Sequence, residues 1–379
     1  METLTCHWTP ESGWDLPSQA ADRPDLVLYF SCPETMTGED SPVLDLVRRF
    51  PDVPVCGCST AGEISGSRVN DRSVVAALVN FSSSTARAVA EALHDAGDSH
   101  QAGRRAGARL ASPGLRHVMI LSGGLAVNGT ALVEGFRAVL PAGVAVTGGL
   151  AGDGDRFGKT LVGLGADIRP DQLVAIGFYG EKISVGYASR GGWEAFGPKR
   201  RITRAQGNTL FELDGQPALQ LYKRYLGERA EGLPATGLLF PLGLSRPADP
   251  DHLLVRTILA IDEENQSLTF AGDMPEGADV RLMKATSVQL VEGASSAAAL
   301  ALPPDRSSCS LAVLVSCVGR RLVLGQRTDE ELEAVTDHLP EGCPAIGFYS
   351  YGEACPCDRS GSSELHNQTM TVTLLGETA

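Results

Sequence analysis

The sequence predicts a mixed α/β (α+β) protein with two domains, each a mixed and largely antiparallel sheet with helices packed on it. Three observations point to this class. The 379 residues are 43 % hydrophobic, which is enough for a large core and for two domains. Apolar runs of strand length alternate with amphipathic segments of helical period. Short turns connect several neighbouring strands, which favours antiparallel pairing.

The first half of the chain carries five strand-like runs and three helical segments. An amphipathic helix over 217–226 then precedes a Gly- and Pro-rich stretch at 227–237. We place the domain boundary in that stretch, so the predicted domains are 22–226 and 237–375. We expect strands at 26–30, 74–81, 117–121, 173–179 and 183–188, and helices at 40–50, 101–111 and 130–140.

The second half repeats the mixture of strands and helices. Acids fill the first turn of the helix expected at 328–338, where the helix dipole favours them. Strands are expected at 253–261, 267–270, 279–283, 309–317 and 365–375, and a further helix at 287–300. Alternation along the final strand predicts one face of His366, Gln368, Met370, Val372 and Leu374 and an opposite face of Asn367, Thr369, Thr371 and Thr373.

Composition excludes several classes of partner. Lys and Arg total 32 against 46 Asp and Glu, so the formal charge of −14 opposes binding to nucleic-acid phosphates or anionic lipids. No apolar run approaches the ~20 residues that a membrane-spanning helix requires. The N-terminus has acids and Pro where a signal peptide needs basic and apolar residues. We therefore expect a cytoplasmic protein.

The nine Cys residues form no recognisable disulfide framework or zinc motif. An odd count without an export signal favours free thiols. Two C-x-C pairs, Cys56/Cys58 and Cys355/Cys357, lack the C-x-x-C spacing and the matching half of a zinc site, unless the four sulfurs meet in space.

Common catalytic and phosphate-binding motifs fail on inspection. The segment ending in Gly158-Lys159-Thr160 resembles a P-loop, but Asp153 stands where the first Gly is required. The segment 57–61 begins like a nucleophile elbow around Ser59, yet Ala61 replaces the closing Gly and no His partner is recognisable. The sequence also lacks H-E-x-x-H, EF-hand and dinucleotide-binding motifs.

An internal echo links the two halves of the chain. Residues 54–63 and 344–353 share the spacing P-x-x-G-x-x-x-x-G-E, and residues 144–153 end similarly in Gly152-Asp153. Duplication and coincidental turn chemistry in a Gly-rich chain both explain the echo.

Five segments together resemble the FIST family: CGCSTAGEI (56–64), GGLAGDG (148–154), CVGRRLVLGQR (317–327), GFYSYGE (347–353) and ELHNQTMTVTLL (364–375). The resemblance extends from about residue 26 to residue 375. It implies an N-terminal and a C-terminal FIST domain in an intracellular signal-transduction protein of bacteria or some eukaryotes.

The resemblance implies a sensory module that binds small ligands, with amino acids proposed. Such modules pass the signal to kinases, cyclases or chemotaxis proteins. This chain leaves no room for an output domain, so we expect a separate partner such as a histidine kinase. Some members, of the NosP type, are haem proteins that sense nitric oxide, and this alternative stays open.

Acidic and hydroxyl side chains at the ends of strands are candidate ligand-binding groups. Glu63 and Glu353 each follow a Gly, and either carboxylate suits the ammonium group of an amino acid. Asp153 is a third such acid. The alternative is that each acid caps a turn through backbone N–H groups. The neighbouring hydroxyls expected to orient a ligand belong to Ser59, Thr60, Ser350 and Tyr351.

Two basic positions complete the set. Arg320 and Arg321 suit a ligand carboxylate or a haem propionate, since a guanidinium binds such groups with two hydrogen bonds; a solvated helix turn is the alternative. His366 suits haem iron or a ligand carboxylate, with Asn367 beside it, and a core His satisfied by a carbonyl is the alternative.

Three hypotheses follow. The first is a ligand-binding sensor without catalysis. The second is an enzyme that uses Ser59 or Cys58 with Glu63, which a nearby His would support. The third is a passive scaffold, which predicts a large exposed apolar patch and no enclosed polar pocket.

Overall fold

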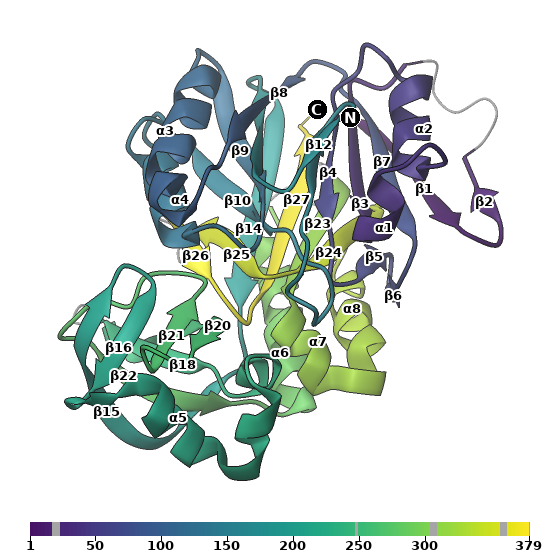
Figure 1. The fold of residues 1–379 in the computed structure, drawn as a ribbon. Helices are drawn as coiled ribbons and strands as arrows, with labels where there is room; N and C mark the ends of the chain where they lie inside the picture. Colours follow the sequence, from purple (N-terminus) through teal and green to yellow (C-terminus); the bar gives the residue numbers. More distant parts are fainter. Residues whose placement is uncertain (17–22, 247–248, 304–308, 357–361, 379) are drawn as a thin grey trace.

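The computed structural model describes residues 1–16, 23–246, 249–303, 309–356 and 362–378. It confirms the mixed α/β class: strands and helices alternate through the chain, and helices lie beside mixed sheets (Figure 1). Three strand pairs are parallel, namely β3/β4, β9/β10 and β23/β24, while the other ladders of the described residues are antiparallel.

Three structurally similar units make up about half of the chain. In each unit the first strand pairs in parallel with the second strand and antiparallel with the last strand. In the sequence, a β-hairpin lies between the second strand and the last strand. Unit 1 contains β3 (Leu26–Ser31), α1 (Pro33–Met36), α2 (Pro42–Arg49), β4 (Val55–Ser59), β5 (Glu63–Ser65), β6 (Arg68–Asn70) and β7 (Val74–Asn80).

Units 2 and 3 repeat this order. Unit 2 contains β9 (Leu115–Ser122), α4 (Gly129–Arg137), β10 (Ala145–Leu150), β11 (Val162–Leu164), β12 (Asp167–Arg169) and β13 (Gln172–Tyr179). Unit 3 contains β23 (Cys309–Cys317), α7 (Val318–Leu324), α8 (Thr328–Thr336), β24 (Ala345–Ser350), β25 (Gly352–Pro356), β26 (Ser363–His366) and β27 (Met370–Glu377).

The hairpins are exchanged around a ring. Hairpin β5-β6 of unit 1 adds to β24 of unit 3, β25-β26 of unit 3 adds to β10 of unit 2, and β11-β12 of unit 2 adds to β4 of unit 1. Backbone hydrogen bonds close the ring: Ala61 N to Tyr349 O (2.8 Å), Tyr351 N to Leu150 O (3.1 Å) and Gly152 N to Ser59 O (3.0 Å). No unit therefore completes its sheet alone.

Additional elements flank the units. The last strand of each unit also pairs with one outer strand: β1 (Glu2–Thr9) with β7, β8 (Thr85–Ala92) with β13, and β14 (Ile183–Arg190) with β27. Helix α3 (Ser99–Leu110) packs on α4, and α6 (Ser287–Ala301) packs on α8, β14 and β27. Apolar side chains between the sheets form the central core, and β2 (Gly13–Trp14) extends β1.

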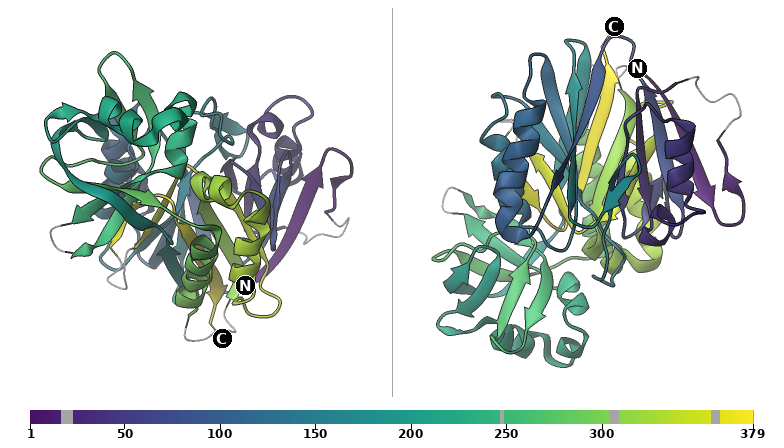
Figure 2. Two further views of the ribbon diagram at one scale, coloured as in Figure 1. Left: turned by 90° about the horizontal axis from the view of Figure 1, so that it is seen from below. Right: turned by 45° about the horizontal axis from the view of Figure 1, so that its top comes forward.

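A separate β-rich unit, residues 194–284, is inserted between β14 and α6 and has its own apolar core (Figures 1 and 2). Its strands run in the order β19-β18-β22-β15-β16-β21-β20. The unit contains β15 (Glu194–Gln206), β16 (Thr209–Leu213), β17 (Gln216–Pro217), α5 (Ala218–Leu226), β18 (Leu242–Arg246), β19 (Asp249–Arg256), β20 (Ile258–Asp262), β21 (Ser267–Phe270) and β22 (Asp279–Lys284).

The predicted domain boundary, 227–237, lies within this β-rich unit, in the 3₁₀ turns Gly227–Gly232 and Ala235–Leu239. Strands from before and after it share sheets: β15 pairs with β22 inside the β-rich unit, β14 pairs with β27, and the exchanged hairpins join further strands. The division into 22–226 and 237–375 stays a prediction.

Two predicted strands are in fact each two strands. The run 253–261 divides at Thr257, because β19 pairs with β18 whereas β20 pairs with β21. The run 365–375 divides at 367–369, where Gln368 has a positive φ of 64°. Strand β26 pairs with β25, and β27 with β23 and β14. The prediction of a single apolar face from His366 to Leu374 was therefore wrong, because His366 belongs to a different sheet from Met370.

The internal echo occupies equivalent places in units 1 and 3. Gly57 lies opposite Tyr29, and Gly347 lies opposite Leu314; a Cβ at either Gly would overlap the carbonyl oxygen of the partner residue. This match in register favours duplication over coincidence. The third segment, 144–153, matches less well. Glu63 and Glu353 each lie opposite the residue after a Gly of the neighbouring unit's second strand, and in unit 2 Val162 takes that place instead of Asp153.

We predict that Gly347→Ala lowers the free energy of unfolding by at least about 2 kcal/mol, because the methyl group meets a backbone carbonyl that the sheet holds in place. Urea unfolding monitored by circular dichroism measures this loss. In the control variant Gly158→Ala the nearest atom to the new methyl group is Asp153 Oδ2 at 3.5 Å, so a change below about 1 kcal/mol is expected. Equal losses in the two variants would contradict the prediction.

Candidate functional site

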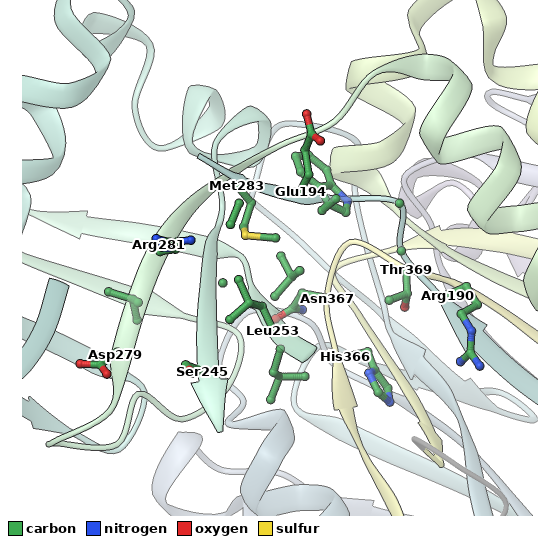
Figure 3. A pocket seen from close by; sticks show the side chains of 18 of the residues that line it. Arg190, Glu194, Ser245, Leu253, Asp279, Arg281, Met283, His366, Asn367 and Thr369 are labelled. Atoms are coloured by element: carbon green, nitrogen blue, oxygen red, sulfur yellow. The ribbon is translucent and has the colours of Figure 1, made fainter. Parts of the chain in front are cut away.

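A cavity of about 600 Å³ lies where unit 3 meets the β-rich unit. Its walls come from the end of β14, the start of β15, strands β18, β19 and β22, and the turn between β26 and β27 (Figure 3). Apolar side chains on the β-rich side, among them Leu253, Val255 and Met283, face polar groups on the unit 3 side. A cavity with apolar walls and a few polar groups is typical of small-molecule sites.

His366, at the end of β26, lines this cavity with 8 % of its surface exposed. Its Nε2 lies 3.0 Å from the carbonyl oxygen of Cys355, so a backbone carbonyl orients the ring. The sequence left open whether His366 faces a cavity, and the contact with a carbonyl is the one expected in the alternative of a core His.

Asn367 lines the same cavity but uses its amide to join three segments. Its Oδ1 accepts a hydrogen bond from Thr257 N (3.3 Å), and its Nδ2 donates to Tyr351 O (3.3 Å). Thr369 also lines the cavity, and its hydroxyl donates to Glu353 Oε2 at 2.9 Å. This turn therefore connects the cavity to the interior of unit 3.

Glu353 lies behind the turn, fully buried, in an arrangement of hydroxyl and amide donors. Its carboxylate accepts from Ser350 Oγ (2.5 Å) and from Thr369 N (3.1 Å) and Oγ1 (2.9 Å). Burial raises the pKa of Glu353 to about 7. The carboxylate thereby attaches the loop after β24 to the start of β27.

Glu63 has the same surroundings in unit 1. It accepts from Thr60 Oγ1 and from Ser73 N (3.1 Å) and Oγ (2.9 Å), and Ser73 precedes β7 as Thr369 precedes β27. Burial raises the pKa of Glu63 to about 7. The shared arrangement shows that each Glu holds a loop of its own unit. This agrees with the alternative in which these acids cap turns instead of binding a ligand.

A second cavity, of about 460 Å³, is lined by Thr60, Glu63 and Asp153. Asp153 accepts from Gly158 N (2.9 Å), from Lys159 N (2.7 Å) and from the hydroxyl of Tyr351. Loop contacts thus occupy this carboxylate. Five candidate residues line one of the two cavities: His366 and Asn367 the larger, and Thr60, Glu63 and Asp153 the smaller.

The remaining candidate residues, Ser59, Ser350, Tyr351, Glu353 and Arg320, line neither of these cavities. Arg320 has no exposed surface; it forms an ion pair with Glu331 (2.7 Å) and donates to Leu290 O (2.8 Å) and Gly191 O. It therefore connects α7, α8 and α6 to a backbone group in the cavity wall. Arg321 instead pairs with Asp71 at 2.7 Å.

Ser59 and Cys58 have none of the surroundings of a catalytic nucleophile. Ser59 Oγ donates to Gly152 O (2.8 Å) and accepts from Leu161 N (2.9 Å), so both of these bonds join it to backbone. Burial raises the pKa of the Cys58 thiol well above its ordinary value, which disfavours the reactive thiolate. The geometry at these positions gives no support to the hypothesis of an enzyme that uses Ser59 or Cys58 with Glu63.

The cysteine pairs hold no metal cluster within the described residues. Cys56, Cys58 and Cys355 are buried free thiols, while Cys357 lies outside the residues that the structure describes.

Sequence reasoning missed Arg190, the segment Gly191–Trp193, and the wall formed by β18, β19 and β22. The pair Gly191-Gly192 after a strand was a usable signal, since it marks the passage from β14 into β15. The residues of the β-rich wall carry no local signature, because strand pairing alone brings them to the cavity.

Comparison with known proteins matches residues 25–216 to the FIST N domain and residues 218–356 to the FIST C domain. The chain belongs to the FIST family. FIST domains imply a small-ligand sensory role, and the family is sensory, not enzymatic.

Relatives of this FIST protein include two uncharacterized proteins from two strains of Mycobacterium tuberculosis. Each is 28 % identical over 257 residues, which is 64 % of this chain and 63 % of the relative. The match thus spans less than two thirds of the relatives' length. No described helix of the FIST protein is long and apolar enough to span a membrane.

The two buried Glu residues predict a pH-dependent stability. Because folding raises each pKa from 4.5 to about 7, the folded chain keeps protons that the unfolded chain releases. Their contribution to stability is full below about pH 4.5 and is lost as the pH rises through about 7. The loss amounts to at most about 3 kcal/mol for each carboxyl group.

The measurement is urea unfolding between pH 4.5 and pH 8 for the wild type, Glu63→Gln, Glu353→Gln and the double variant. Gln keeps one acceptor oxygen, replaces the other by an NH2 group that a neighbouring hydroxyl can accept from, and does not titrate. Each substitution is therefore expected to flatten the stability decrease. If the difference in unfolding free energy between wild type and double variant does not change with pH, the two carboxyl groups do not titrate as predicted.

Proposed function

We propose that this FIST protein is an intracellular sensor whose small-molecule ligand binds in the 600 Å³ cavity between unit 3 and the β-rich unit. The observation that carries the proposal is the construction of this cavity: apolar side chains of the β-rich wall line it together with polar and charged side chains from both walls, and the two walls belong to different parts of the fold. A ligand that contacts both walls changes the free energy of their relative arrangement.

The cavity wall also has a route to the surface helices. Gly191, in the wall, accepts a hydrogen bond from Arg320, which in turn binds Glu331 of α8 and the Leu290 carbonyl of α6. A displacement of the β14–β15 connection on ligand binding therefore alters contacts of α6, α7 and α8. These helices would present the change to a separate signalling protein such as a histidine kinase, a cyclase or a chemotaxis protein.

An amino acid is the ligand class that we propose first, because the cavity offers Arg190 for a carboxylate and Glu194, which is exposed and also pairs with Lys284 at 3.3 Å, for an ammonium group. The predicted ligand role of Thr60, Glu63 and Asp153 would require a second molecule in the smaller cavity. Internal hydrogen bonds already occupy these groups, so we favour the larger cavity.

Haem is a second candidate, favoured by one observation: His366 lines the same cavity with its Nε2 held by a backbone carbonyl. A backbone carbonyl that binds one ring nitrogen fixes the orientation of the ring. His366 would hold the iron and Arg190 a propionate, and the iron would supply the binding of nitric oxide.

A ligand screen tests the principal proposal. We predict that at least one amino acid raises the midpoint of thermal unfolding of the wild type, and that Ser245→Trp, which fills the cavity, abolishes the shift. Gln206→Trp introduces the same side chain at an exposed position of β15 outside the cavity and is expected to keep the shift. A shift that survives Ser245→Trp would place the ligand elsewhere.

Haem titration tests the second candidate. If His366 binds iron, added haem produces a Soret band that His366→Ala shifts or removes and that nitric oxide alters in the wild type. His338→Ala serves as the control. His338 lies just after α8, is hydrogen-bonded to Ser295 and does not line the cavity. Identical spectra for wild type and His366→Ala would exclude this histidine as the ligand.

A further inference from the structure

The charges that line the 600 Å³ cavity differ in sign from those of the protein as a whole. The chain carries a net charge of −14, yet three basic side chains of the lining, Arg190, Lys199 and Arg281, face two acids, Glu194 and Asp279. Both acids have basic partners. Lys284 Nζ lies 3.3 Å from Glu194, and Asp279 binds both Lys199 (2.7 Å) and Arg201 (3.2 Å).

The two arginines have no such partner. The guanidinium of half-buried Arg190, at the end of β14, donates to the Ser189 carbonyl oxygen at 2.8 Å and pairs with no described carboxylate. Arg281, on β22, is exposed, and its guanidinium forms no ion pair or hydrogen bond with the part of the chain that the structure describes. Both side chains are thus available to an anion.

These arginines come from opposite walls. Strand β14 belongs to the sheet of unit 3, whereas β22 belongs to the β-rich unit. In Figure 3, Arg190 lies near His366 on one side, Arg281 lies on the other, and Leu253, Met283 and Asn367 stand between them. The cavity therefore has a cationic group at each end and mainly apolar side chains between.

We propose that the ligand carries two oxyanion groups, one bound by Arg190 and one by Arg281, joined by an apolar body that lies against Leu253, Val255 and Met283. A guanidinium binds a carboxylate or a phosphate through two parallel hydrogen bonds, so either group satisfies the two ends. A dicarboxylic acid, an acidic amino acid and an alkyl bisphosphate all meet this description. This inference rests on the proposed function, since it specifies the ligand of the same cavity.

A doubly anionic ligand also explains how binding would act on the fold. Because each end of the ligand pairs with a different wall, occupancy ties β14 of unit 3 to β22 of the β-rich unit. A ligand with a single anionic group contacts one arginine and leaves the other wall without an ionic contact. The second anionic group is therefore what couples ligand binding to the relative arrangement of the two parts.

The test compares each diacid with its own half-amide. Isothermal titration of the full-length wild type uses linear dicarboxylates of increasing length, acidic amino acids, their half-amides, and alkyl bisphosphates with the matching monophosphates. We expect one diacid to bind at least about ten-fold more tightly than its half-amide. We also expect added salt to lower the affinity of the diacid more than that of the half-amide. Whether dicarboxylates or bisphosphates show this advantage identifies the oxyanion.

Variants then assign the two ends. Arg190→Gln and Arg281→Gln are each expected to remove the advantage of the diacid over its half-amide, whereas Arg116→Gln, at an exposed position of β9 outside the cavity, leaves it unchanged. Unchanged midpoints of thermal unfolding show that the variants are folded. Equal affinities of diacid and half-amide, an advantage that survives both cavity substitutions, or no binding of any diacid overturns the inference.

Failure of this inference is distinguishable from failure of the proposed function. Suppose that Ser245→Trp abolishes binding of a ligand, whereas Arg190→Gln and Arg281→Gln leave its affinity unchanged. The cavity then remains the sensory site, and only the proposal of a doubly anionic ligand is overturned. A diacid that binds the Ser245→Trp variant as tightly as the wild type overturns both, because the arginines then bind it without the cavity.

Discussion

The exchange of β-hairpins among three units is the constraint on which the rest of this structure depends. Each unit leaves one edge of its second strand open, and the hairpin of another unit covers that edge. An uncovered edge exposes a row of unpaired N–H and C=O groups, so none of the units is a satisfactory fold by itself. The three units must consequently form together, through contacts between residues far apart in the sequence.

Buried charged groups fix the loops at the centre of this exchange. Glu63 and Glu353 each accept two hydrogen bonds from the residue before the last strand of their unit, Ser73 or Thr369, and a third from a hydroxyl that follows or ends the second strand, Thr60 or Ser350. Arg320 pairs with Glu331 and satisfies backbone carbonyls of α6 and of the β14–β15 connection. A buried charge is costly unless its lone pairs or protons all find partners, and these arrangements provide them. Several residues that look functional in the sequence thus stabilise the fold.

The 600 Å³ cavity arises from an interruption of the threefold pattern. The β-rich unit is inserted after β14, the outer strand of unit 3, and its sheet stands against the turn between β26 and β27. That turn contains Asn367 and Thr369, which bond to Tyr351 and Glu353 in the interior. The cavity is therefore adjacent to the groups that hold unit 3 together.

The sequence by itself determined the fold class, most of the strands and helices, and the family, since local periodicity, turn residues and ordered motifs are properties of neighbouring residues. It also marked Glu63 and Glu353 as equivalent through the repeated P-x-x-G-x-x-x-x-G-E spacing. The tertiary structure alone decided that 365–375 forms two strands in two sheets, since partners from β25 and β23 select the pairing. It likewise decided that Arg190 and Arg281 face one cavity, because strand pairing between distant segments positions them and no local pattern records it.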